Sequence, residues 1–100
     1  MSTSCVVVGP EHLAGDSALT LDVELRAAAR SAKVVILDLA RTSYVDSSAL
    51  GVIIHAYREL ETKGVTLRLI NVPPRVVAFL KTTRLDSVLG TGDSPKPDQP

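Results

Sequence analysis

The chemistry-bearing cluster in this sequence is the run Asp46-Ser47-Ser48, which follows an apolar stretch and precedes an amphipathic one. Such a run is expected to bring its serines to the first turn of a helix, where free backbone N–H groups and the helix dipole favour negative charge. A serine hydroxyl in that position can cap the helix, or it can accept a phosphoryl group. Which of the two applies decides what the protein does.

The same serines are poorly placed for hydrolytic chemistry, because a nucleophilic serine needs a base about 2.6–3.2 Å away. His55 lies seven residues after Ser48, which is about 10.5 Å along a helix axis. His12 is expected on a loop, and the chain has no Gly-x-Ser-x-Gly elbow, glycine-rich phosphate loop, CxxC pair or HExxH motif. We therefore expect no enzyme activity, no metal site and no cofactor.

The elements that position this run follow from the spacing of the apolar residues. Residues 34–39 form a β-branched run typical of a strand covered on both faces. A helix is expected from about Ser47 to Lys63, ending at the capping residue Gly64. The remaining pattern predicts strands at 5–8 and 65–70, a helix after a cap at Asp16 or Ser17, a short helix at 75–82 and a final apolar segment around 85–89.

Strands that alternate with helices indicate an α/β domain with a mostly parallel central sheet and helices packed against it. We expect a single domain of this kind at residues 5–90. Residues 1–4 and 91–100 are expected to be disordered, and the second of these segments contains three prolines and no large apolar residue.

The helix predicted from Ser47 has an apolar face and a face that begins at Ser48. With a rotation of about 100° per residue, the apolar face contains Leu50, Ile53, Ile54, Tyr57 and Leu60. Val52, His55 and Glu59 lie near Ser48 on the other face. This stripe is either an ordinary solvated face or a docking surface with the serine at its head, and the residue types alone leave both interpretations open.

Composition narrows the classes of partner. Among 100 residues, 11 basic and 11 acidic side chains give a formal net charge of zero, and hydrophobic residues make up 45%. We expect an ordered core and no binding to nucleic acid or to an anionic membrane surface.

Cys5 is the single cysteine, and there is neither a signal-like segment nor an apolar run of about 20 residues. We therefore expect a cytoplasmic protein.

The segment around the serines resembles the STAS domain of anti-sigma factor antagonists. The resemblance covers about Val6 to Leu89 and implies a single-domain STAS-like fold. The matching residues are the strand that ends in Asp38-Leu39, then Val45-Asp46-Ser47-Ser48, then Leu50-Gly51-Val52, with a later strand at 64–69 and a late helix at 76–81.

In that family a partner serine kinase, which is also the anti-sigma factor, phosphorylates the second serine of Asp-Ser-Ser. The unmodified protein binds this ATP-binding kinase and thereby frees the sigma factor for transcription, as in bacterial stress responses. The resemblance therefore implies that Ser48 is the phosphoacceptor and that Asp46 and Ser47 support it.

The chain departs from the family pattern close to this site. Ala49 stands where a glycine usually follows the two serines. Its methyl group is expected to crowd the backbone beside the acceptor hydroxyl, and phosphorylation is then expected to be slower or absent. The acidic loop that contacts the kinase corresponds to residues 9–12 with a longer run before the helix. The residues expected to bind the partner are Ala49, Val52, His55, Glu59, Glu11 and Asp16.

Other functions stay open beside this interpretation. One is a STAS module without a phosphorylation switch, either a scaffold of a stress-signalling complex or an accessory subunit bound to a transporter ATPase. Another is a surface cleft for a nucleotide or lipid, although the sequence has no phosphate loop. Family members usually have a further strand before the one predicted at 5–8. An open sheet edge there favours pairing with another chain, and a homodimer is one form of it.

Overall fold

Strands and helices alternate along the chain, as the apolar pattern predicts. The computed structural model describes residues 4–82, and the predictions for residues 1–3, for the segment at 85–89 and for the tail lie outside them. Ser4, which was expected to be disordered, belongs to the first strand. The elements are β1 (Ser4–Val8), β2 (His12–Leu13), α1 (Asp16–Ala29), β3 (Val34–Asp38), β4 (Tyr44–Val45), α2 (Ser47–Thr62), β5 (Thr66–Ile70) and α3 (Pro74–Thr82).

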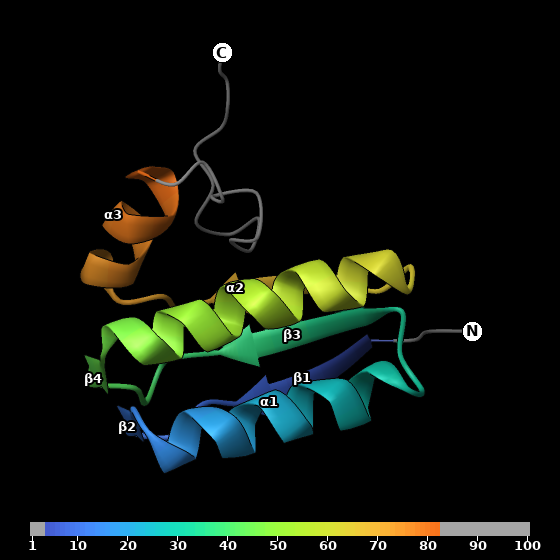
Figure 1. Cartoon of the computed structure of the whole chain (residues 1–100), viewed down its shortest axis with the longest axis horizontal. Coiled ribbons are helices and arrows are strands. Elements are labelled where there is room, and N and C mark those ends of the chain that lie inside the picture. The colour runs from blue at the N-terminus through green and yellow to red at the C-terminus, as the bar shows by residue number, and fades with distance from the viewer. Residues whose placement is uncertain (1–3, 83–100) are drawn as a thin grey trace.

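The main sheet has the strand order β1-β3-β5, and both neighbouring pairs are parallel. The register aligns Val6 with Ile36 and Ile36 with Arg68. Helices α1 and α2 lie side by side over one face of this sheet, and α3 lies beyond the start of α2 (Figure 1). A second pair of strands, β2 and β4, is also parallel. The predicted α/β class with a mostly parallel sheet and packed helices is confirmed.

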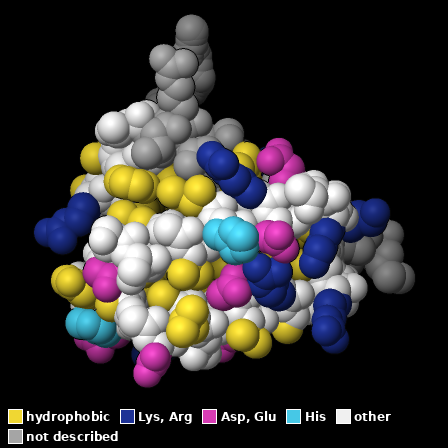
Figure 2. Space-filling view, in the orientation of Figure 1, with side chains coloured by type: hydrophobic (Ala, Val, Ile, Leu, Met, Phe, Trp, Pro, Cys, Tyr) yellow, Lys and Arg dark blue, Asp and Glu magenta, His cyan; other side chains and the backbone are white. Residues whose placement is uncertain are grey.

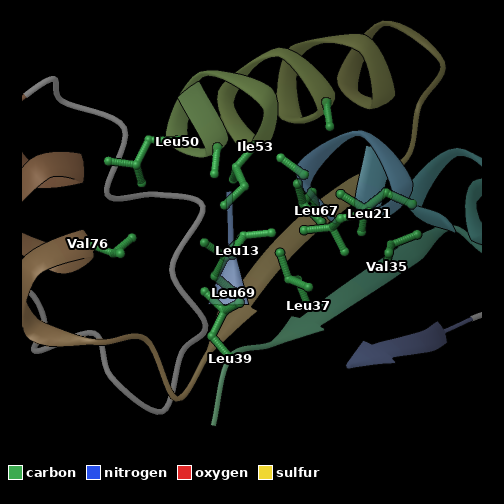
Figure 3. Packing of buried hydrophobic residues seen from close by; sticks show 14 of the residues in the cluster. Leu13, Leu21, Val35, Leu37, Leu39, Leu50, Ile53, Leu67, Leu69 and Val76 are labelled. Carbon is green, nitrogen blue, oxygen red and sulfur yellow. The ribbon is translucent and has the colours of Figure 1, made fainter. Parts of the chain in front are cut away.

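The hydrophobic core fills the space between this sheet and the helices (Figure 3). Alternate residues of β3 and β5 point into it, and all four of these side chains are buried: Val35, Leu37, Leu67 and Leu69. The other residues of β3 are only half-buried. The expectation that this strand is fully covered on both faces is therefore wrong, because the packed helices lie on one face of the sheet.

The buried face of α2 is centred on slightly different residues than the sequence predicts. Leu50, Ile53 and Leu60 are buried as expected, but Ile54 and Tyr57 are only half-buried. Ala56 is fully buried instead. Helix α1 packs against α2, and its Arg26 pairs with Glu59, so the flank of α2 that carries Glu59 lies toward α1.

Helix α1 starts without the predicted side-chain cap. Its N-cap is Gly15 at φ 57°, and no side chain accepts a capping hydrogen bond. The Ser17 hydroxyl donates to the carbonyl oxygen of His12 at 2.6 Å and accepts from the N–H of Ala14 at 2.9 Å. Ser17 therefore stabilises the preceding loop through these hydrogen bonds and does not cap the helix.

Candidate functional site

The start of α2 is built around the carboxylate of Asp46. Asp46 has extended backbone angles, φ −96° and ψ 174°, and is the N-cap of the helix. Its Oδ1 accepts the N–H of Ala49 at 2.8 Å, which satisfies one of the free donors of the first turn. The predicted helix start at Ser47 and the capping role of this run are thereby observed.

Ser48 is exposed, and its hydroxyl donates to the same Oδ1 of Asp46 at 2.8 Å. The hydrogen bond from the Ala49 N–H, followed by that from the Ser48 hydroxyl, holds the pKa of Asp46 below its ordinary value. Asp46 is therefore ionised at neutral pH and acts as an acceptor for the Ser48 hydroxyl, which it orients. A carboxylate of such low basicity is a weak general base.

Two further residues lie near this carboxylate: His12, which was expected on a loop but belongs to β2, and Tyr44, which sequence reasoning missed. In the β2–β4 pair, His12 is aligned with Tyr44, and their rings stack with centroids 4.6 Å apart and planes 18° from parallel. Because side chains at i and i+2 of an extended segment share a face, Tyr44 and Asp46 point to the same side. The hydrogen bonds from Ala49 and Ser48 lower the pKa of Asp46 most, and the electrostatic contribution of His12 to this lowering is the smallest.

The loop before α1 is tied to the loop before α2 by several hydrogen bonds. The buried Thr42 hydroxyl donates to the carbonyl oxygen of Pro10 at 2.7 Å. The N–H of Ser43 donates to the carbonyl oxygen of Glu11 at 2.8 Å, and that of Asp46 to Leu13 at 3.2 Å. These contacts hold the Glu11 loop against residues 42–46, which directly precede the two serines, although the loop lies more than thirty positions away in the chain.

The predicted partner-binding residues fall into different environments. Glu11 and Asp16 are exposed, and Asp16 is the first residue of α1. His55 is exposed on α2, whereas Val52 is half-buried and packs against the core. Glu11, Asp16 and His55 are therefore accessible to a partner, whereas Val52 is only partly accessible.

Ala49 is completely buried, with 0% of its surface exposed. The expectation that Ala49 contacts a partner is therefore wrong, because its methyl group lies in the core cluster. Its effect on the phosphorylation of Ser48 stays a prediction. Ser48, one position earlier on the helix, is turned by about 100° and faces solvent.

Glu59 already has a partner within the chain. Its Oε1 lies 3.0 Å from the Nη1 of Arg26 on α1, and Arg26 also contacts Asp22 at 3.0 Å. The hydrogen bond and charge of Arg26 lower the pKa of Glu59. Over the face formed by α1 and α2, basic and acidic side chains are interleaved, so neither sign dominates there (Figure 2).

Residues 4–82 contain neither a metal-binding cluster nor a membrane-spanning helix. No three His, Cys, Asp or Glu side chains in this part gather into a group that could hold a metal ion. Of the helices described, none combines the length and apolar character needed to cross a membrane.

Comparisons with known proteins agree on the fold. A search of curated proteins found no match. The solved structure of phosphorylated SpoIIAA, a Bacillus cell fate determinant, is similar with a TM-score of 0.75 and 20% identity, over 90% of this chain and 83% of that one. The unphosphorylated form of the anti-sigma factor antagonist SpoIIAA gives 0.73 and 21%, over 90% and 80%.

Transporter proteins contain a similar fold. A sulfate transporter family protein from Wolinella succinogenes has a TM-score of 0.58 and 19% identity, over 89% of this chain and 71% of that one. The murine anion transporter Slc26a9 gives 0.63 and 18%, over 82% of this chain and 14% of the transporter. The family model of the STAS domain matches residues 9–96. With most of its length matched, the chain belongs to the STAS domain family.

Proposed function

We propose that this protein is an anti-sigma factor antagonist that binds an anti-sigma factor with serine kinase activity and is released when Ser48 is phosphorylated. The observation that carries the proposal is the exposed Ser48 hydroxyl, held by Asp46 at the first turn of α2. The fold similarity to SpoIIAA, an anti-sigma factor antagonist with a phosphorylated form, supports it. The chain itself needs no catalytic group for this role.

A phosphate on Ser48 would change the local hydrogen bonding. The esterified oxygen has no proton left to donate, so the bond to Asp46 is replaced by repulsion between a carboxylate and a group of about −1.5 to −2 charges. The helix N-terminus offsets this by about 0.3–1 kcal/mol. The phosphate is therefore expected to turn away from Asp46 toward solvent, which is the space a bound partner would occupy.

The effect on binding follows from the cost of an unpaired charge in an interface. That cost is several kcal/mol, and about 3 kcal/mol weakens binding roughly a hundredfold. No refolding of the domain is needed for such a switch. We expect Ser48→Ala to bind the kinase whether or not ATP is present and Ser48→Glu to bind it poorly. Equal affinities of the two variants would contradict the mechanism.

The direct test is the intact mass of the protein after incubation with ATP and each anti-sigma kinase from its own source, followed by peptide mapping. We expect one phosphoryl group on Ser48. Ser47→Ala is the matched control, because Ser47 is also exposed but is not the residue bonded to Asp46. Phosphorylation should persist in Ser47→Ala and disappear in Ser48→Ala. The reverse pattern would assign the acceptor to Ser47.

A second candidate function is a STAS accessory or scaffold subunit without a phosphorylation switch, in a transporter or a stress-signalling complex. The similarity to the sulfate transporter family protein and to Slc26a9 favours it. This function predicts stable binding to another protein with no phosphorylation by any of the kinases and with equal binding by Ser48→Ala and Ser48→Glu.

A further inference from the structure

Within residues 4–82, no strand pairs with the outer edge of β1. In the strand order β1-β3-β5, this strand has β3 as its one neighbour within the described residues. Directly after it, the N–H of Gly9 donates to the carbonyl oxygen of Asp38 at 2.8 Å. Successive residues of a strand direct their N–H and C=O groups to alternate edges. The backbone groups of Ser4, Val6 and Val8 therefore point away from β3.

The side chains of this edge suit a strand partner. Val6 and Val8 are 57% and 50% exposed, and β1 contains no charged residue. Proteins usually protect an open edge with a charged side chain, a proline or a bulge. On the opposite edge of the described sheet, β5 carries the charged residue Arg68. Strand β1 contains neither a charged residue nor a proline.

We propose that β1 pairs antiparallel with β1 of a second copy of this chain, about a two-fold axis through Val6. In this register Val6 lies opposite Val6 of the second copy, and Ser4 lies opposite Val8. All the outward N–H and C=O groups of both strands are then hydrogen-bonded. The strand is complementary to itself, so the contact is isologous and closes after two copies. The proposal does not depend on Ser48 being a phosphoacceptor.

The position of α1 is compatible with this pairing. Helix α1 lies over both β1 and β3 on one face of the sheet. A two-fold axis perpendicular to the sheet keeps both copies of α1 on the same face. Since adjacent strands are about 4.8 Å apart, the two helices would lie about 10 Å apart, which is within the usual distance for packed helices.

The flank of α1 that would face its copy is suitable for such an approach. A groove of about 210 Å³ separates the end of β1 at Val8 from this flank, where Thr20 and Glu24 line it. One turn further along the same side, the helix carries Ala27 and Ala28. Small side chains at this level allow two helices to pack closely, and Glu24 is the single charged residue that lines the groove.

The first test is the mass of the intact chain in solution by light scattering and sedimentation over a range of concentrations. We expect a species of twice the chain mass of 10.6 kDa. Val6→Lys should raise the dimer dissociation constant at least about tenfold, because it places two like charges opposite each other. Thr66→Lys is the matched control, since Thr66 is exposed on the other edge strand, and it should leave the dimer unchanged.

Thermal melting should show that both lysine variants remain folded. A parent chain that stays monomeric at every concentration overturns the proposal. A dimer that Val6→Lys leaves intact, or that Thr66→Lys weakens equally, overturns the assignment to β1.

Cysteine crosslinking tests the register. In a Cys5→Ser background, Val6→Cys should form a crosslinked dimer on mild oxidation, because residues facing each other across the axis have Cα atoms about 5.5 Å apart. Val8→Cys in the same background is the control and should crosslink far more slowly, since it lies opposite Ser4. Equal crosslinking at both positions would contradict the pairing.

Discussion

Asp46 has two partners at the residue scale, the N–H of Ala49 and the hydroxyl of Ser48. The first bond stabilises the helix and the second orients the proposed acceptor. The two contributions differ in what they require of residue 46, because an amide oxygen can cap a helix as well as a carboxylate can, whereas the negative charge strengthens the bond from the hydroxyl.

This difference can be measured with two variants of Asp46. Asp46→Ala should lower the free energy of unfolding by about 1 kcal/mol, because the cap is lost. Asp46→Asn should keep most of that stability, since asparagine is also a good N-cap. Urea denaturation of the two variants beside the parent checks this expectation. An equal loss in both would show that the charge, and not the capping oxygen, stabilises the helix start.

The central residues of the site were predictable because they are adjacent in sequence. The strand before Asp46 and the amphipathic run after it fix the helix start, and the helical period places Ser48 outside. His12 and Tyr44 were not predictable in the same way, since their stacking depends on two loops meeting. Ala49 was misplaced because a small apolar residue at a helix start fits either face, and the packing of the core decides between them.

Helices α1 and α2 are joined by two kinds of contact at the element scale. Leu25 of α1 is fully buried in the core. The neighbouring Arg26 forms its ion pair with Glu59 at the surface, where the two side chains are 34% and 39% exposed. Water screens such a pair, so the apolar contact is expected to dominate the association of the helices.

A comparison of adjacent residues tests this ranking. Leu25→Ala should lower the free energy of unfolding by about 2–5 kcal/mol, because it leaves a cavity in the core. A double-mutant cycle with Arg26→Ala and Glu59→Gln should give a coupling energy below about 1 kcal/mol. Chemical denaturation of these variants measures both the loss of unfolding free energy and the coupling energy. A coupling energy as large as the effect of Leu25→Ala would mean that the ion pair is a main source of helix association.

The long elements were predictable from the sequence and the short ones were not. Runs such as residues 47–63 repeat the helical period often enough to be recognised. Strands β2 and β4 contain two residues each, which is too few to show an alternation. Their pairing also depends on hydrogen bonds from Thr42 and Ser43 to a distant loop. No local pattern records such contacts.

At the scale of the whole molecule, parallel strands bring the functional groups to one edge of the sheet. The carboxyl ends of β1, β3 and β5 lie together, and α2 starts beside them. Asp38, the last residue of β3, accepts the side-chain N–H of Asn71 at 3.0 Å and the N–H of Ala40 at 2.9 Å. In the proposed dimer the strands of the two copies run in opposite directions, so the two Ser48 sites would face opposite ends.

The stability of the whole domain should depend on pH through its hydrogen-bonded carboxylates. The Asn71 side chain and then the Ala40 N–H lower the pKa of Asp38, and the pKa values of Asp46 and Glu59 are lowered as described above. A carboxyl group with a lower pKa in the folded state binds fewer protons there than in the unfolded state. It therefore contributes stability above its unfolded pKa and loses that contribution as the pH falls through its folded pKa.

We expect the free energy of unfolding to be nearly independent of these groups above about pH 5 and to decrease as the pH falls below about 4. Urea denaturation at a series of pH values measures this dependence. Asp38→Asn should make the decrease shallower, because one of the three carboxylates no longer titrates. An unchanged slope in this variant would show that Asp38 has the same proton affinity in both states.

One oxygen atom, the Oδ1 of Asp46, accepts both the amide of Ala49 and the hydroxyl of Ser48. Phosphorylation of the hydroxyl therefore changes the hydrogen bond that the same oxygen accepts from the N–H of the buried Ala49. In a nitrogen–proton correlation spectrum, the Ala49 resonance becomes an intrinsic reporter of the state of Ser48. The helix cap thus makes a solvent-facing modification visible from inside the domain, without a label on the serine.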